Sequence, residues 1–582
     1  MLKDDPLRRV LIVDLSRRRW WVEERPDLFE EGLGGAGVAI RLLEEECPAG
    51  ADPLGPENPI ILAVGPLVGL FPLASKTVAM FKSPHTGNLG ESHAGGRSAV
   101  ALRMAGYGAL VIRGISPSPV YLVVQEDGVY FRDASALWGM RSSETVGTVL
   151  RERESGSGQR SIMRIGRAGE RGVTYAGVNT ETYRHFGRLG LGAVFGSKRL
   201  KALVVAGRRT LPVADRRAYR QSYDTIFRAA TESPLMQKYH ELGTAMNVLP
   251  LNEIGALPTR NLQAGRFDGA ENISGENLAT NYLGRRVACA HCPVACIHLA
   301  ALRLPHPTEP YFYKTSMLGY DHEPIFAAGS MLGISDVAGM LLLMEEMEIQ
   351  GMDVMSAGVT LAWATEALER GLISTAETDG LTLAWGDAAT YIEAARRIVS
   401  QPNEFYQALA RGAEYAASRY GGADFALTCG GNEMAGYHTG PACYLGYLTG
   451  ARHSHLDSAG YSLDQKAAAK GETLTPEGVA EALLKEERWR QVLSSLVVCF
   501  FARGVYDAET VAQALAVAGF PRTPDDLHRL GEETLRRKQA FKAREGFDLA
   551  ALRIPARVLE TPTPLGVLDE GFLRRAIEAF GA

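Results

Sequence analysis

Three cysteines stand close together near the middle of the chain, in the stretch CAHCPVAC. Cys289, Cys292 and Cys296 follow the spacing C-x2-C-x3-C. Cysteines three and four residues apart on a loop or at a helix start can direct their thiolates at one centre, which iron–sulfur ligation requires. The spacing therefore favours an iron–sulfur cluster.

Other chemistries for these cysteines stay open. Zinc is one, because His291 and His298 lie in the same stretch and would complete a Cys/His tetrahedron. A radical S-adenosylmethionine cluster fits less well, since its usual order, C-x3-C-x2-C, is the reverse of this one. Unliganded thiols are the last alternative, although a cytosolic protein rarely spaces cysteines this way by accident.

A cubane cluster normally takes four protein ligands, so a fourth must come from elsewhere in the chain. The candidates are Cys47, Cys429, Cys443 and Cys499. Cys499 lies in the apolar run SSLVVCFFARG, where a ligand would be shielded from water, but a small buried side chain fits that run equally well. Closing a loop of about 200 residues to Cys499 would cost on the order of 5 kcal/mol, which a metal-site binding energy on the order of 10 kcal/mol offsets.

The bulk composition is that of a soluble globular protein. The 582 residues are 46% apolar and 22% charged, and the chain is too long for one hydrophobic core. A net charge of −5 gives no reason to expect nucleic acid or an anionic membrane as a partner. Seven cysteines are too sparse for a disulfide framework, and we find no secretory signal or membrane-spanning run, so we expect a cytoplasmic protein.

The spacing of apolar residues predicts an α+β fold. Strand-like runs such as VLIVDL, PIILAV, ALVIRG and ALVVAG, separated by glycines, occupy residues 1–208. Beyond them apolar residues recur three and four apart, as in residues 335–352, which is typical of helices. The simplest division is a β-rich domain over 1–208 and two mainly helical domains over 209–405 and 406–582.

Two glycine-rich stretches have the look of nucleotide-binding loops but lack the flanking features. GLGGAG, residues 32–37, fits G-x-G-x-x-G, yet no buried strand is predicted before it. GLGAVFG, residues 190–196, departs in spacing and runs into SKRLK without the acidic residue that binds a ribose. We therefore expect no NAD site.

Over its whole length the sequence resembles the aldehyde:ferredoxin oxidoreductase family, whose members carry tungsten or molybdenum on two pterins. The resemblance rests on the order and spacing of PENPIILAVGPLVG, SPHTGNLGESHAGG, AGYGALVIRG, GRLGLGAVFGSKRLKALVV, LNEIGALPTRN, CAHCPVAC, GISDVAG and REGF. It implies a β-rich base for the cofactor, two helical domains covering it, and a 4Fe–4S cluster close to one pterin. It also selects Cys499 as the fourth cluster ligand.

The resemblance further implies where the pterin cofactor is held. Glycine loops let backbone N–H groups approach an anionic cofactor closely, and Gly95, Gly96 and Gly187 supply such loops, with Arg188 as a neighbouring cation. A first D-x-x-G motif is present as Asp336–Gly339. Each glycine also fits an ordinary tight turn. A Mg²⁺ ion bridging the pterin phosphates is a further cofactor that the family pattern allows. The remaining glycines of these loops are Gly87, Gly90, Gly190 and Gly192.

Three positions depart from the family pattern. Lys76 stands where an arginine between pterin and cluster is usual, so the charge is kept but the fork geometry is lost. His93 stands where an asparagine is usual. The second pterin motif reads SSLVVC, Ser494 to Cys499, without its aspartate and glycine, so a contact there would use a serine hydroxyl or the backbone.

The resemblance places a histidine and a glutamate near the metal. His455 in RHSHLDSAGYS aligns best with the histidine, next to His453, although a hydrogen-bonded interior histidine is the structural alternative. Glu323 in YDHEPIFAAG matches the glutamate, while Glu309 is closer to the cysteines in the chain. His455 would hydrogen-bond a substrate carbonyl oxygen, and Glu323 would orient or deprotonate water.

The leading hypothesis is an oxidoreductase that converts an aldehyde to a carboxylic acid at a tungsten or molybdenum bis-pterin centre. The 4Fe–4S cluster would pass electrons singly to ferredoxin or to a small iron–sulfur subunit, and the chain would form a homodimer or a hetero-oligomer. A second hypothesis is a low-potential reductase subunit resembling that of class II benzoyl-CoA reductase. A third, of another class, is an iron–sulfur or zinc electron-transfer protein without pterin.

Overall fold

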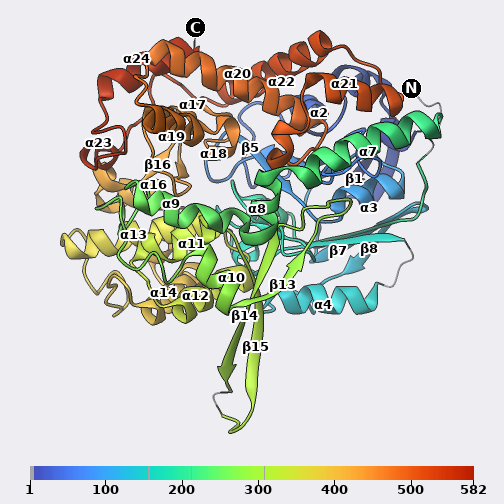
Figure 1. Ribbon diagram of the computed structural model, residues 1–582. Helices are drawn as coiled ribbons and strands as arrows, with labels where there is room; N and C mark the ends of the chain where they lie inside the picture. The colour runs from blue at the N-terminus through green and yellow to red at the C-terminus, as the bar shows by residue number, and fades with distance from the viewer. Residues whose placement is uncertain (1–4, 155–157, 212, 307, 582) are drawn as a thin grey trace. The chain divides into compact units, whose positions relative to one another are not determined.

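The computed structural model describes residues 5–154, 158–211, 213–306 and 308–581. The chain forms two compact units, each assembled from separate segments (Figure 1). The segments of unit 1 are residues 1–237, Ala288–Val294 and Lys485–Asp548. The segments of unit 2 are Lys238–Val287, Ala295–Leu484 and residues 549–582. The predicted boundary near residue 405 stays a prediction.

Unit 1 is built on two mixed β-sheets. The first has the strand order β2-β1-β6-β3-β4-β5, and the second has the order β11-β10-β9-β12-β7-β8. The strands are β1 (Arg9–Asp14), β2 (Arg19–Glu24), β3 (Ile60–Ala63), β4 (Thr77–Lys82), β5 (Leu89–Ala94), β6 (Ala109–Arg113), β7 (Val120–Gln125), β8 (Gly128–Asp133), β9 (Gln159–Arg164), β10 (Val178–Asn179), β11 (His185–Phe186) and β12 (Leu200–Gly207). The β-rich character predicted for the first 208 residues is confirmed.

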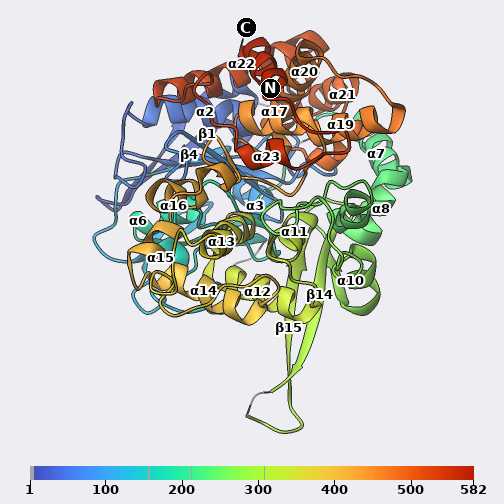
Figure 2. The same cartoon turned by 90° about the vertical axis from the view of Figure 1, so that its left-hand side faces the viewer.

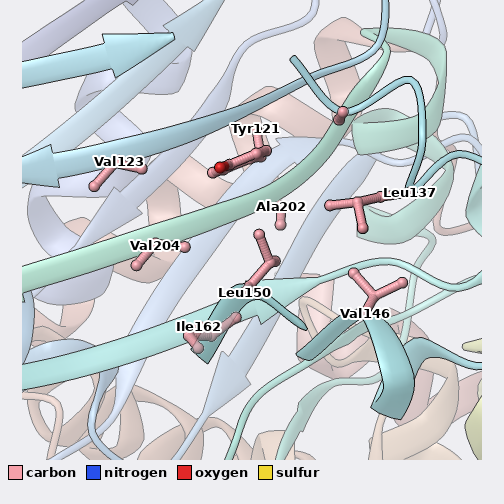
Figure 3. Packing of buried hydrophobic residues seen from close by; sticks show 9 residues of the cluster. Tyr121, Val123, Leu137, Val146, Leu150, Ile162, Ala202 and Val204 are labelled. Carbon is pink, nitrogen blue, oxygen red and sulfur yellow. The ribbon is translucent and has the colours of Figure 1, made fainter. Parts of the chain in front are cut away.

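Strand position explains strand composition in these sheets. β12 reads LKALVVAG and is buried throughout, because it lies between β7 and β9. Figure 3 shows what covers one face of this sheet: Val146 and Leu150 of α4 pack against Tyr121, Ile162 and Val204 of the strands. The helices of unit 1 are α1 (Pro26–Gly32), α2 (Gly35–Glu46), α3 (Ser98–Ala105), α4 (Ser143–Arg153), α5 (Arg167–Glu170), α6 (Leu191–Ser197), α7 (Arg216–Glu232), α21 (Ala508–Val517) and α22 (Pro524–Arg544).

The glycines of GLGGAG serve close packing at the start of α2. Gly35 has φ +36°, and a Cβ there would lie 2.1 Å from the carbonyl oxygen of Ser494. The backbone N–H of Gly37 donates to Ser495 Oγ at 3.0 Å.

Two helices, α8 (Pro234–Leu242) and α20 (Pro476–Ser495), run across the segment boundaries of the two units.

Unit 2 is mainly helical but carries an antiparallel sheet in the order β13-β14-β15. Its strands are β13 (Leu283–Val287), β14 (Ile297–Pro305) and β15 (Tyr313–Tyr320), and a separate pair is formed by β16 (Thr428–Cys429) and β17 (Asn432–Glu433). The helical spacing predicted from residue 209 onward did not reveal this sheet, because the leucines and alanines of IHLAALRLP suit either period.

The helices of unit 2 confirm the helical prediction for most of its length (Figure 2). Residues 404–420 form two helices that are separated at Gly412, whose φ of +92° is left-handed. The helices are α9 (Val248–Glu253), α10 (Gly275–Asn281), α11 (His322–Ala328), α12 (Val337–Gln350), α13 (Val354–Glu369), α14 (Ala388–Ser400), α15 (Glu404–Leu409), α16 (Ala413–Tyr420), α17 (Pro441–Thr449), α18 (His455–Ser458), α19 (Gly460–Lys470), α23 (Ala556–Glu560) and α24 (Glu570–Gly581).

A bilayer span requires a helix that is both long and apolar. In the described part of the chain, no single helix is long and apolar enough for one. The segments His322–Leu332 and Val337–Gln350 reach that hydropathy only as a pair, with a bend of 117° between them.

Candidate functional site

Two remote segments of unit 1 bring cysteines to the same backbone residue. Leu73 donates its N–H to the carbonyl oxygen of His291 at 3.1 Å, and its own carbonyl accepts from the N–H of Cys499 at 2.9 Å. His291 lies between Cys289 and Cys292, so Leu73 holds the cysteine loop and Cys499 on its two sides. The structure therefore brings Cys499 to the loop, and its role as the fourth ligand stays a prediction.

The neighbourhood of Cys289 includes residues that the resemblance assigned to the pterin. A Cβ built on Gly95 would lie 2.8 Å from Cys289 Sγ and 3.4 Å from Lys76 Nζ. The next residue, Gly96, accepts the N–H of Ala290 at 2.9 Å. Lys76, Gly95, Gly96 and Cys289 therefore lie together.

The other cysteines have surroundings that disfavour a thiolate. Burial raises the pKa of Cys429 to about 12, and burial also raises the pKa of Cys47 and of Cys443. Cys499, by contrast, is only partly buried. Since metal ligation requires the thiolate, this contrast favours Cys499 as the fourth ligand.

The histidines of the cysteine stretch do not offer a zinc site. Both ring nitrogens of His298 face carbonyl oxygens: Nδ1 lies 3.0 Å from that of Cys296, and Nε2 lies 3.0 Å from that of His240. Over the described residues, no three His, Cys, Asp or Glu side chains are grouped as a single ion would need. A cubane does not need that convergence, because its thiolates bind different irons.

Packing accounts for some of the predicted cofactor glycines and not for others. A Cβ on Gly90 would strike the Phe81 ring at 2.5 Å, and Gly190 and Gly192 approach backbone carbonyls in the same way. Gly96 has φ +99° and faces Thr182. Around Gly187 the nearest atom to a built Cβ is 3.9 Å away, so the space over it is open, and the half-buried Arg188 follows it in the chain.

His93 is held by a buried charge pair. Its Nε2 lies 2.7 Å from Glu91 Oε1, and Glu91 Oε2 lies 2.5 Å from Lys538 Nζ. The side chains of Glu91 and Lys538 are each 1% exposed, so neither charge is solvated. The ring of His93 also contacts Phe500, the residue after Cys499. The histidine thus joins the cluster region to a buried ion pair.

The D-x-x-G motif has a structural role at the start of α12. Asp336 is the N-cap, and its carboxylate accepts the N–H of Ala338 at 3.3 Å and of Gly339 at 2.8 Å. A Cβ on Gly339 would lie 2.7 Å from that of Ala388 in α14. Capping and close packing account for both motif residues, and their contact with a pterin stays a prediction.

Unit 2 brings together the predicted glutamate and histidine. Glu323 lies in the first turn of α11 and His455 begins α18; His455 Nε2 is 3.1 Å from Glu323 Oε1. Tyr437 donates its hydroxyl to the same oxygen at 2.9 Å. Both ends of the pair are largely buried, with the side chains of His455 and Glu323 7% and 13% exposed.

The electrostatics of this triad keep Glu323 ionised. Burial opposes its charge, but the hydrogen bond and positive charge of His455 outweigh burial, and the pKa of Glu323 is lowered to about 2. Burial and the neighbouring Glu323 raise the pKa of Tyr437, which therefore stays a donor. Nδ1 of His455 is buried without a protein partner, which leaves it for a ligand.

The structure separates these residues from their sequence neighbours. His453 Nδ1 lies 2.9 Å from the carbonyl oxygen of Tyr447, and its ring fills the space beside Gly430, so it has a packing role. Glu309 is exposed between β14 and β15. Tyr437 was not predicted, because nothing in the sequence stretch NEMAGYHTG indicates that its hydroxyl meets Glu323.

A thiol site held by two remote segments and a buried Glu–His–Tyr arrangement are typical of a redox metalloenzyme. Residues 10–207 match the family model described as "Aldehyde ferredoxin oxidoreductase, N-terminal domain", and residues 222–579 match "Aldehyde ferredoxin oxidoreductase, domains 2 & 3". The chain belongs to the aldehyde ferredoxin oxidoreductase family, and the resemblance seen in its motifs is confirmed.

Individual relatives cover nearly the whole chain. The tungsten-containing aldehyde ferredoxin oxidoreductases of Thermococcus kodakarensis and Pyrococcus furiosus are each 33% identical over 577 residues, covering 96% of this chain and 92% of the relative. A chain of a benzoyl coenzyme A reductase active-site complex with 1,5-dienoyl-CoA matches with a TM-score of 0.83 and 22% identity, covering 99% of this chain and 93% of that chain. The latter likeness shows the fold.

Proposed function

We propose that this protein oxidises an aldehyde to its carboxylic acid at a tungsten bis-pterin centre and passes the electrons through a 4Fe–4S cluster to ferredoxin. Relatives named for this activity match 96% of the chain. The observation that carries the proposal in the structure is the Glu323–His455–Tyr437 arrangement, in which a buried imidazole nitrogen is left without a protein partner.

The residues present fit both cofactors. Cys289, Cys292, Cys296 and Cys499 would hold the cluster. The pterin would lie against Lys76, His93, Gly95, Gly96, Gly187 and Arg188, with Asp336 and Gly339 as the predicted second contact. When bound, the tungsten bis-pterin supplies two-electron oxidation chemistry and the cluster supplies one-electron transfer. Tungsten is preferred over molybdenum because the relatives are tungsten-containing.

The protein's own groups divide the proton chemistry between them. A carboxylate whose pKa is about 2 is a weak base at neutral pH, so we assign Glu323 to orienting His455 and not to removing a proton from water. With Nε2–H donated to Glu323, Nδ1 is the ring nitrogen that remains to exchange a proton with water or substrate. Once protonated, Nδ1–H can donate to a developing oxygen charge.

Anaerobic purification followed by metal analysis and a dye assay tests the proposal. We expect about four irons per chain with tungsten, and aldehyde-dependent reduction of benzyl viologen. Zinc alone, or iron without a group 6 metal, would refute it.

The fold neighbour makes a CoA-ester ring reductase the second candidate, and His93 and Ser494, which depart from the family pattern, leave room for it. Dienoyl-CoA oxidation by a tungsten-loaded protein that is inactive on every aldehyde tried would favour that candidate.

A further inference from the structure

The hairpin of β14 and β15 extends beyond the helices of its own unit in both views (Figure 1 and Figure 2). Three consecutive aromatic residues stand where β15 begins: Tyr311 is 100% exposed, Phe312 67% and Tyr313 53%. No other run of three exposed large apolar side chains occurs in the described residues. Exposed aromatic groups of this kind mark protein interaction sites more often than solvated surface.

The hairpin is fixed on one side and open on the other. Lys314 Nζ and Ser316 Oγ bind Glu345 of α12 at 3.0 and 2.6 Å, so their face is anchored to unit 2. Arg303 and Thr315 are paired across the strands on the opposite face, and both are exposed. The Arg303 guanidinium lies 4.3 Å from the centre of the Tyr313 ring and orders it.

The backbone at the tip is also held in an uncommon conformation. Tyr311 has φ +70°, in the left-handed region that non-glycine residues rarely adopt. The N–H of His306 donates to the carbonyl oxygen of Phe312 at 2.9 Å, so the turn that displays the aromatic residues is closed by a hydrogen bond. Such strain persists where the surrounding structure requires it and is frequent at functional sites.

Charge on this sheet differs in sign from the chain as a whole. β13, β14 and β15 contain Arg285, Arg286, Arg303 and Lys314 but no aspartate or glutamate, whereas the chain carries a net charge of −5. Glu345 pairs with Lys314, and the connecting loop carries the exposed Glu309, so part of this charge is offset. The remaining arginines leave the sheet with a net positive charge that steers an acidic partner to it.

The hairpin is also continuous with the cluster loop. β14 begins at Ile297, the residue after Cys296, and His298 in the same strand is hydrogen-bonded to the Cys296 carbonyl oxygen. A partner bound along β14 therefore contacts the strand that starts at a proposed cluster ligand.

We propose that Arg303, Tyr311, Phe312, Tyr313 and Thr315, here called the hairpin surface, dock the acidic iron–sulfur protein that accepts electrons from this enzyme, a diffusing ferredoxin. The inference rests on the proposed function for the identity of the partner. The aromatic tip supplies apolar contact, and the basic strands supply orientation and a fast encounter.

Ferredoxin binding and aldehyde turnover are measured separately, so that the docking surface and the aldehyde function can each be refuted without the other. The holoenzyme is purified anaerobically, and its binding to an immobilised acidic 4Fe–4S ferredoxin is followed by interferometry. We expect Arg303→Glu and the double variant Tyr311→Ser/Phe312→Ser each to weaken binding by about tenfold or more, and added salt to weaken the wild type. Arg303→Lys keeps the charge and should restore most of the binding.

Matched controls come from exposed positions of the same unit. Arg419→Glu reverses a charge on α16, and Leu372→Ser removes an exposed apolar side chain; both should bind ferredoxin within about twofold of the wild type. Aldehyde-dependent viologen reduction should be equal in all variants, and its absence in the wild type would refute the aldehyde function alone.

Three results would overturn the docking surface. The first is a wild type that does not bind the ferredoxin. The second is hairpin variants that bind as well as the controls. The third is a halved mass in light scattering for the hairpin variants with ferredoxin binding intact, which would show that a second copy of this chain, and not ferredoxin, occupies the surface.

Discussion

At the scale of single residues, Glu323 makes the stability of unit 2 depend on pH. Its pKa is held at about 2, whereas an unfolded glutamate titrates near ~4.3, so folding favours the ionised form. The resulting stabilisation is fully present above the unfolded pKa and is lost as the pH falls through about 2. We expect Glu323→Gln to lack this acid-dependent part, measured by urea unfolding at a series of pH values. Parallel pH profiles for variant and wild type would contradict the pairing.

Tyr437 is expected to act on catalysis through Glu323. Removing its hydroxyl takes one of two donors from a buried carboxylate, so Tyr437→Phe should lower kcat by about tenfold or more with little change in KM. The acid limb of the pH profile should also move upward, because the pKa of Glu323 rises.

Tyr391→Phe is the matched control for this change, since Tyr391 is a buried tyrosine of α14 whose hydroxyl is hydrogen-bonded to Thr365 Oγ1 at 2.9 Å. Equal kinetics for the two variants would show that Tyr437 has only a packing role.

The residues of the site were predictable to different degrees. The spacing of CAHCPVAC predicted that its three cysteines share one site, because local spacing alone places them together. Leu73, Glu91 and Lys538 gave no such signal, since Leu73 meets the cysteine segments, and Glu91 meets Lys538, across hundreds of residues. The sequence alone could not decide whether His453 or His455 lies near Glu323. In the fold, the ring of His453 packs beside Gly430.

At the scale of elements, the turn after α20 delivers Cys499 to the cysteine loop. We expect Cys499→Ala to lose iron and the electron paramagnetic resonance signal of the reduced 4Fe–4S cluster, because the thiolate is a proposed ligand. Cys443→Ala removes a buried thiol and should keep both. A full cluster in Cys499→Ala would identify another fourth ligand.

Variants of Asp336, at the start of α12, distinguish a helix-capping role from a role in cofactor binding. Asp336→Ala should cost about 1 kcal/mol in the free energy of unfolding, whereas Asp336→Ser keeps a capping oxygen and should cost less. If Asp336 also contacts the pterin, both variants lose pterin content, measured by fluorescence after oxidation. Loss of stability without loss of pterin would leave the residue as a cap alone.

Elements with an unambiguous period were the ones that the sequence predicted well. β1, β3, β6 and β12 are short apolar runs, and all appear as predicted. The hairpin of β14 and β15 did not, because its register is set by pairing across a loop and not by local spacing.

At the scale of the whole molecule, the cluster should contribute to stability as well as to electron transfer. Cysteine–metal bonds form only in the folded chain, so removing iron with a chelator under anaerobic conditions should lower the thermal midpoint by several degrees. Calorimetry before and after chelation measures this. An unchanged midpoint would show that the iron does not stabilise the fold.

Family membership could be read from the order of motifs along the chain, but the two-unit organisation could not. Each unit gathers segments from distant parts of the sequence, and Ala288–Val294 belongs with the β-rich unit although its flanking residues do not. The composition along the chain does not indicate which unit a segment belongs to, because long-range contacts and not local sequence patterns define the units.

The backbone around the cysteines has a consequence for maturation. Leu73, His291 and Val497 all have φ between +55° and +64°, a conformation that costs non-glycine residues on the order of 1 kcal/mol each. Hydrogen bonds between Leu73, His291 and Cys499 hold this shape within the polypeptide itself. We expect this shape to persist without the cluster, so that a preassembled cluster can be inserted after the chain has folded.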